Sequence, residues 1–305
     1  MNPIIRIAHP IPRSFVLAAG AVTGLALPVL IELGRFALSS NLYSHTVAMP
    51  LVVAWLVAMH PSAIPPGPRC VSGTILAGAG SLALAAWAWM SRSAYPASHD
   101  PLAWAAAAWV VALSAVAFWF LGFGWMRARA GTLVLLAFTI PFPEVLESAL
   151  EAFLQRGSAE AADLLFAASG LPYLRDGQIF RLPSITMEIE QECSGIHSSV
   201  VLFITSIVAG QMFLPAGWRR WVLTLAVIPL ALIRNGFRVL TLGVLCERIG
   251  PHMIDHWIHH RGGPVFFALS LVPFFAMLVL LARVGRPGVS TPPRAHTTDG
   301  KSALP

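Results

Sequence analysis

The stretch "WVLTLAVIPLALIRNGFRVLTLGVL", from Trp221 to Leu245, decides the fold class of this protein. It is longer than the run of about 20 apolar residues that crosses a bilayer. Its only charged residues are Arg234 and Arg238. In a chain whose mean hydropathy is +0.71, such a run indicates a helix that crosses a membrane.

The composition of the whole chain supports this interpretation. Of its 305 residues, 56% are hydrophobic and 11% are charged, which gives more apolar surface than a water-soluble fold can cover. Segments that we predict to span the membrane lie at about 14–33, 45–60, 72–90, 102–122, 130–143, 194–214, 221–245 and 263–283. We therefore predict an all-α, polytopic bundle of about eight transmembrane helices over residues 1–286. A polar, proline-rich tail over 287–305 is predicted to be disordered and cytoplasmic.

The basic residues predict the orientation of the chain. The formal net charge is +6, but the basic side chains lie in short loops, so they orient the spans and do not indicate nucleic-acid binding. Predicted cytoplasmic segments contain Arg6, Arg13, Arg69, Arg127, Arg129, Arg219, Arg220, Arg283, Arg286, Arg294 and Lys301. The short opposite loops contain only Arg35, Arg92, Arg248 and Arg261. We therefore expect a multi-pass protein of the cytoplasmic (inner) membrane with both termini in the cytoplasm.

One large external segment follows from this topology, over about 143–193. Residues 144–170 carry apolar side chains at helical spacing, which predicts an amphipathic helix, or two helices broken at Gly157, against the membrane surface. Residues 185–192 alternate between apolar and polar, which predicts a short strand that leads into Cys193. This thiol would then lie at the extracytoplasmic rim, where the next span begins.

The two intramembrane arginines are candidate functional residues. A rise of 1.5 Å per residue places Arg238 about 25 Å along its helix, near the same rim, with Arg234 one turn deeper. Charges at this depth are costly and usually mark functional sites. Arg234 and Asn235 are therefore candidates for binding substrate or an anion. In the alternative interpretation, both arginines snorkel or form structural pairs with external acids such as Glu190 or Glu192.

The loop after this span contains four histidines: His252, His256, His259 and His260. The spacing of His256 and His260 suits a metal, but no cysteine or acidic residue is spaced with them in a recognised metal motif. We therefore predict no metal and no cofactor. A histidine of this loop can instead serve as a proton donor beside the thiol.

Cys193, Arg238 and the loop histidines come from three different spans but are predicted to reach one rim. A neighbouring cation favours the reactive thiolate. A histidine can protonate a leaving amine, and an arginine can stabilise a carbonyl oxygen as it becomes anionic. This combination predicts acyl transfer through a thioester on the extracytoplasmic side.

Two alternatives remain open at this point. An oxidising exterior could join Cys193 to Cys246 in a disulfide, which would remove the nucleophile. The chain could also be a polytopic transporter or an exopolysaccharide-assembly component in which Arg234 and Arg238 bind an anion.

The motifs "ECSGIHSS", "NGFRV" at 235–239 and "HHRGGPVFF" from His259 resemble, in the same order, those of the exosortase/archaeosortase family. So do "YSHT" at 43–46 and "IPFP" at 140–143. The resemblance covers about 40–285 and implies an eight-span membrane cysteine peptidase or transpeptidase.

The resemblance also implies roles and partners. Cys193 would be the nucleophile, Arg238 would stabilise the oxyanion or the substrate, and His259 would be the catalytic histidine, with His260 and His256 as alternatives. The substrates would be exported, membrane-anchored proteins with a C-terminal sorting signal, which consists of a short recognition motif, a transmembrane helix and a basic end. The acceptor of the acyl group is not identified by the sequence.

Overall fold

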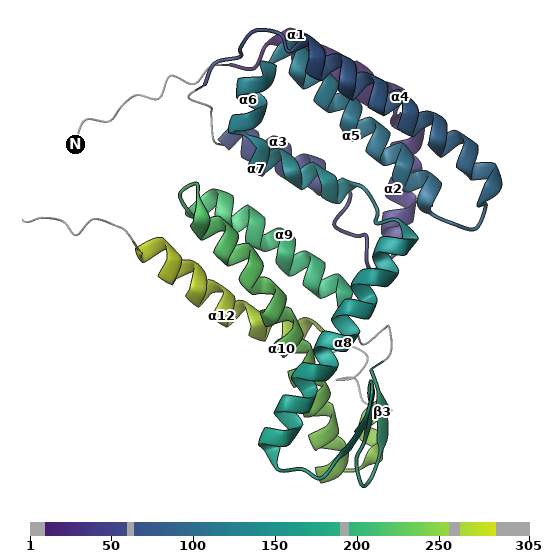
Figure 1. The fold of residues 1–305 in the computed structure, drawn as a ribbon, viewed down its shortest axis with the longest axis vertical. Helices are drawn as coiled ribbons and strands as arrows, with labels where there is room; N and C mark the ends of the chain where they lie inside the picture. Colours follow the sequence, from purple (N-terminus) through teal and green to yellow (C-terminus); the bar gives the residue numbers. More distant parts are fainter. Residues whose placement is uncertain (1–9, 60–63, 190–194, 256–262, 285–305) are drawn as a thin grey trace, which may run out of the picture.

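The computed structural model describes residues 10–59, 64–189, 195–255 and 263–284, and its architecture is almost entirely helical (Figure 1). The predicted all-α, polytopic class is therefore confirmed. The predicted tail over 287–305 lies outside the described residues.

Among the described residues, five helices are long and apolar enough to cross a membrane. They are α4 (Val71–Ala94), α5 (Asp100–Phe120), α9 (Ile196–Phe213), α10 (Trp218–Arg248) and α12 (Gly263–Arg283). Two bent helix pairs raise the number to seven if each pair forms one span. The described part of the chain thus holds five to seven candidate spans, where the sequence predicted about eight.

The first predicted span, 14–33, is not one straight helix. Helices α1 (Arg13–Leu25) and α2 (Leu27–Ser39) meet there at an angle of 68°. The break falls at Ala26, and Pro28 follows in the first turn of α2. Proline lacks the N–H of the helical ladder and clashes with the preceding turn, so a continuous helix is disfavoured at this point.

The predicted span 130–143 also ends early. It consists of α7 (Ala130–Leu133) and the 3-10 helix η1 (Val134–Thr139), after which the chain turns by 102° into α8 (Glu144–Ser169). The turn is formed by the "IPFP" segment, whose two prolines prevent the helix from continuing. This motif therefore determines where α8 begins and in which direction it runs.

The predicted span 45–60 is represented by α3 (Met49–Met59), whose 11 residues are fewer than a bilayer requires. Turns over 41–48 precede it and include the "YSHT" motif. A short helix, α6 (Gly122–Ala128), connects α5 to α7.

Helix α10 is longer than a membrane span requires. Its 31 residues correspond to about 46 Å, whereas the hydrocarbon core is about 30 Å thick. Its C-terminal end therefore extends past the core, and Figure 1 shows this end beside α8 and the strands. Helices α9, α10 and α12 pack against one another, as expected for the last three spans.

The C-terminal end of α10 packs with the second half of α8 and a small sheet. We call this region the sheet lobe and define it as residues 158–189 and 239–253. Its antiparallel strands, in the order β1-β2-β3, are β1 (Leu174–Asp176), β2 (Ile179–Arg181) and β3 (Thr186–Glu188). The 3-10 helix η3 (Pro251–Asp255) follows α10.

Two predictions for the external segment can be compared with the sheet lobe. Helix α8 runs without a break through Gly157, so the alternative of two helices is wrong. A Cβ at Gly157 would lie 2.8 Å from the Leu232 side chain, so this glycine lets α8 and α10 approach closely. The predicted strand is β3, in which Met187 is buried while Thr186 and Glu188 are exposed, which confirms the alternation there.

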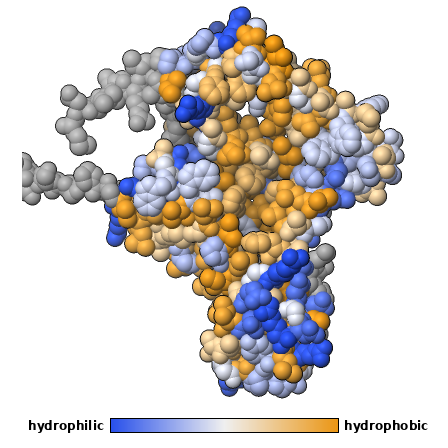
Figure 2. Space-filling model, in the orientation of Figure 1, coloured by the Kyte–Doolittle hydropathy of each residue, from blue (hydrophilic) through white to orange (hydrophobic). Residues whose placement is uncertain are grey.

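The surface of the helical bundle differs in polarity from the surface of the sheet lobe. Figure 2 shows apolar residues over most of the helical bundle and hydrophilic residues concentrated on the sheet lobe. Only 6% of the most apolar stretch of helix α4 is buried, compared with 39% of that of α5. Because so much apolar surface is exposed, the outer face of α4 is suited to contact lipid.

Candidate active site

Arg234 is a buried cation with part of its hydrogen-bonding capacity unused. Its side chain extends from α10, and the residue is 7% exposed. One guanidinium nitrogen, Nη2, donates to Ser199 Oγ at 3.2 Å and to the Gly195 carbonyl at 3.5 Å. The other, Nη1, is buried and has no hydrogen-bond partner among the residues that the structure describes. Within the described part of the chain, no carboxylate pairs with this charge.

Gly195 brings the start of α9 against Arg234. It is the residue before α9 and has a φ of +67°, in the left-handed region that favours glycine. A Cβ there would lie 3.1 Å from Arg234 Nη2 and 3.2 Å from Asn235 Oδ1. The glycine of the "CSG" triplet is therefore needed both for its backbone conformation and for close contact with α10.

The Gly195 carbonyl is also a shared acceptor at the first turn of α9. Besides Arg234, it accepts hydrogen bonds from the hydroxyls of Ser198 and Ser199 at 3.0 and 2.8 Å. Ser198 and Ser199 thus fix the carbonyl of Gly195, which also accepts from Arg234 of α10.

Asn235 and Gly236 attach α10 to α8. Asn235 is 2% exposed and donates from Nδ2 to Ser158 Oγ at 3.0 Å. A Cβ on Gly236 would lie 2.7 Å from the Ala162 backbone nitrogen, so only glycine permits this helix contact. The first two residues of "NGFRV" therefore position the helix that carries the arginines.

Arg238 lies one turn further along α10 and is half-buried. It is close enough to Arg234 for the two positive charges to disfavour each other. Two neighbouring cations, with no acidic ion-pair partner for the deeper one among the described residues, form a region of positive potential that suits an anionic group.

The remaining predicted catalytic residues, Cys193, His256, His259 and His260, lie outside the described residues, as do Glu190 and Glu192. Their meeting at one rim stays a prediction. Cys246, the proposed disulfide partner, is a fully buried free thiol in the core of the sheet lobe.

Sequence reasoning did not identify a second pair of histidines, His45 and His197. His45 belongs to "YSHT" and His197 to "CSGIHSS", and the two imidazoles are close enough that charge on one disfavours charge on the other. Both Nδ1 atoms are buried, and no described residue forms a hydrogen bond with either of them. The two histidines thus bring the segment before α3 near the first turn of α9, and the sequence signal for this is that both residues lie in the family motifs.

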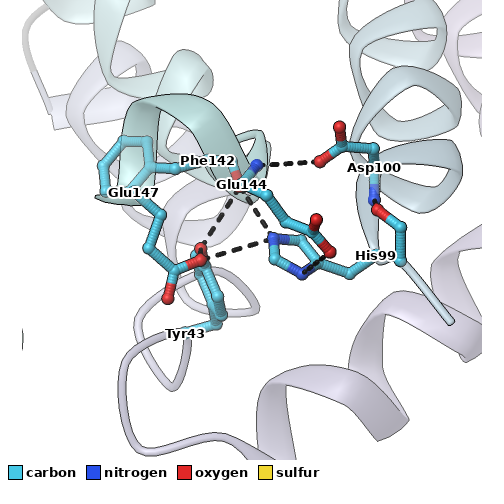
Figure 3. Close-up of polar contacts among 7 residues, drawn as sticks. Tyr43, His99, Asp100, Phe142, Glu144 and Glu147 are labelled. Atoms are coloured by element: carbon cyan, nitrogen blue, oxygen red, sulfur yellow. Dashed lines mark hydrogen bonds and ion pairs between the residues drawn. The ribbon is translucent and has the colours of Figure 1, made fainter. Parts of the chain in front are cut away.

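A polar cluster where α8 begins was also not foreseen (Figure 3). The Tyr43 hydroxyl donates to Glu147 at 2.7 Å, and His99 Nε2 lies 2.8 Å from the Phe142 carbonyl. Asp100 accepts from the backbone N–H of Glu144 at 2.8 Å. The motifs "YSHT" and "IPFP", nearly 100 residues apart in the chain, thus meet where α8 starts.

The electrostatics of this cluster keep the tyrosine protonated. Burial raises the pKa of the Tyr43 phenol above its ordinary value, and the hydrogen bond to Glu147 raises it further. His99 also lies 3.4 Å from the Glu147 carboxylate and 3.7 Å from that of Glu144. The cluster therefore joins three segments through neutral and charge-assisted hydrogen bonds.

Within the described ranges, no three His, Cys, Asp or Glu side chains are arranged so that they could hold a metal ion. The chemistry available at the candidate site is that of guanidinium, hydroxyl and imidazole groups.

Comparison with known proteins identifies the family. The model of a family described as transmembrane exosortase matches residues 37–276, which is most of the chain. No curated protein and no solved structure matches the chain.

Proposed function

Because the chain belongs to the transmembrane exosortase family, we propose that it is a membrane-embedded cysteine transpeptidase that cleaves C-terminal sorting signals of exported proteins. At family level it is a sorting-related membrane transpeptidase. Beyond the family level, we propose that Cys193 is the nucleophile, that the intermediate is a thioester, and that the reaction takes place on the extracytoplasmic side.

The observation that carries the proposal is the contact between Arg234 and Gly195. Cys193 precedes Gly195 by two residues, and two residues extend at most about 7 Å. Gly195 itself contacts a buried guanidinium whose Nη1 has no hydrogen-bond partner within the described ranges. This chain length allows a thiol at residue 193 to reach the guanidinium, which supports the proposal.

The proposed reaction has two stages, formation of a thioester and its attack by an acceptor. The Cys193 thiolate attacks the scissile carbonyl carbon, and a carbon–sulfur bond forms as the oxygen becomes anionic. An arginine stabilises this oxygen. A histidine, His259 by motif, protonates the leaving nitrogen as the carbon–nitrogen bond breaks and a thioester remains. An acceptor amine or water then attacks the thioester and regenerates the thiol.

The two arginines are proposed to share the stabilising role. Arg238 occupies the family position in "NGFRV", whereas Arg234 makes the contact with Gly195. A donor aimed at the developing oxyanion contributes about 10²- to 10³-fold to the rate in other hydrolases. Either side chain suits this role, since both are fixed on one helix that is itself held by Asn235 and Gly236.

The active site is proposed to face the periplasm or exterior, with both termini cytoplasmic. In support, most acidic residues of the described chain belong to α8 and the sheet lobe, while Arg219 and Arg220 begin α10 at its opposite end. Basic residues are retained on the cytoplasmic side of membrane proteins.

Co-expression with a reporter tests this function. The reporter is an exported, tagged protein that ends in a recognition motif, a transmembrane helix and a basic tail. Wild type should release the tail, whereas Cys193→Ala should leave it attached at equal membrane abundance. Normal processing by Cys193→Ala would contradict the proposed peptidase activity. It would favour the alternative of an anion-binding transporter or exopolysaccharide-assembly component.

A further inference from the structure

The register of β2 and β3 fixes the direction of their backbone groups. The N–H of Ile189 donates to the Gln178 carbonyl at 3.1 Å, which makes these residues a hydrogen-bonded pair. Bonded and non-bonded pairs alternate along an antiparallel ladder, so Met187 bonds to β2 whereas Thr186 and Glu188 do not. The N–H and C=O groups of Thr186 and Glu188 therefore point away from β2, to the outer edge of the sheet.

These edge groups are unused. No described residue makes a hydrogen bond to the backbone of Thr186 or Glu188, and both residues are exposed. The opposite edge differs, because the pairing of β1 with β2 leaves only Arg175 facing outward. The Arg175 side chain is held by Glu160 and Asp163 of α8. The β3 edge thus offers two donors and two acceptors, and an open edge of this kind can template an added strand.

The path of the chain indicates the direction of such a strand. In the sequence, Cys193 follows Glu188 of β3 by five residues, and the candidate membrane span α9 comes next. A protein with a C-terminal sorting signal has the same order, an extended recognition segment followed by a transmembrane helix. A segment lying parallel to β3 would therefore carry its membrane helix down beside α9, with the intervening residues near Cys193.

We propose that the β3 edge at Thr186 and Glu188 binds the recognition segment of the substrate as an added parallel strand. This inference rests on the proposed function and identifies the ligand as an extended exported polypeptide held by its main chain. Main-chain bonds supply affinity that does not depend on side-chain identity. Specificity then comes from the side chains that flank the strand.

Proline substitution tests the use of the backbone. Glu188→Pro removes an N–H that β2 does not use, so the sheet keeps its ladder, whereas Glu188→Ala keeps the N–H and removes only the side chain. In a Cys193→Ala background, Glu188→Pro should reduce co-purification of the sorting-signal reporter at least tenfold. Glu188→Ala should stay within twofold of its parent. Equal retention by the two variants, or equal loss, would overturn strand addition.

Cross-linking provides a test that does not depend on the proline variant folding. Thr186→Cys or Glu188→Cys, in the Cys193→Ala protein, is oxidised with reporters that carry single cysteines at successive positions. Parallel pairing predicts cross-links at every second position, and the reporter positions nearest the membrane helix should prefer residue 188 over residue 186. Asp176→Cys, exposed on β1, is the matched control. The proposal would be contradicted if cross-links showed no two-residue periodicity or if the positions nearest the membrane helix preferred residue 186. Equal cross-linking at Asp176→Cys would also contradict it.

The two proposals fail in different ways. If Cys193→Ala abolishes processing while the β3 cross-links are absent, strand addition is wrong and the peptidase stands. If Cys193→Ala still processes the reporter, the proposed function is wrong whatever the cross-links show.

Discussion

The Arg234 guanidinium lies 3.2 Å from Ser199 Oγ through Nη2, while its buried Nη1 has no hydrogen-bond partner in the described part of the chain. A buried charge without a counterion is costly to the fold. Under the proposed function, the oxygen that becomes anionic during the reaction would balance this charge.

Replacing this charge should separate activity from stability. We expect Arg234→Met to lower reporter processing about 100-fold or more, the loss typical of an oxyanion donor. Thermal stability in detergent should be unchanged or higher, because a desolvated charge is removed. Arg248→Met is the matched control, since Arg248 is exposed at the end of the same helix. Equal processing by the two variants would show that Arg234 has no part in catalysis.

Gly195→Ala should impair processing through contact as well as through backbone strain. An L-residue at φ +67° costs about 1–2 kcal/mol, and the new Cβ would press on Arg234 and Asn235. Gly170→Ala has the same strain, at φ +72°, but has nothing within 4 Å of the new Cβ. We expect a tenfold or greater loss of processing for Gly195→Ala only, measured with the reporter. A similar loss in both variants would reduce the effect to backbone strain.

Tyr43→Phe should destabilise the junction where α8 begins. The lost hydrogen bond goes to a carboxylate, and such bonds contribute about 1.5–3 kcal/mol. Thermal unfolding of Tyr43→Phe, Glu147→Gln and the double variant gives the coupling energy between the two side chains. Tyr95→Phe is the control, because Tyr95 is 59% exposed. Simple additivity of the two single changes would contradict the proposed connection between "YSHT" and α8.

Acid should loosen the sheet lobe in a way that depends on Arg175. The hydrogen bond and charge of Arg175 lower the pKa of Glu160 below its ordinary value of 4.5. A lowered folded-state pKa means that the stabilisation is complete above the ordinary value and is lost as pH falls through the folded one. The protection of the β1 and β2 amides against hydrogen exchange, relative to their intrinsic rates, should therefore fall below about pH 4.5. Arg175→Gln should abolish this dependence, whereas Arg181→Gln should keep it. The same acid response in both variants would contradict the assignment.

The sequence predicted the helices well where apolar length was the only requirement, as in α4, α5, α9 and α12. It failed at the proline-dependent bends. The sequence stays apolar through Ala26 and through "IPFP", but the backbone cannot continue as a straight helix there. The predicted span 45–60 also included the turn residues His45 to Ala48, which do not continue α3 as a helix.

For the candidate site, too, the sequence predicted some features and missed others. Arg234 was a candidate because a charge in an apolar run is visible in the sequence. Its contact with Gly195 joins residues that are 39 positions apart, and the proximity of His45 to His197 spans about 150 positions. The spacing of residues in a single sequence does not predict such long-range proximity. Asn235 was considered for anion binding, and its Nδ2 is now seen to donate to Ser158.

The central claim is that Cys193 forms a thioester with the cleaved substrate. Purified protein would be incubated with the sorting-signal reporter, quenched in acid, and its intact mass and peptide masses measured with and without hydroxylamine. The account predicts an adduct of the upstream reporter fragment on Cys193 that hydroxylamine removes, with Cys70 and Cys246 unmodified. Processing at the normal rate with no adduct, or processing that continues in Cys193→Ala, would contradict it.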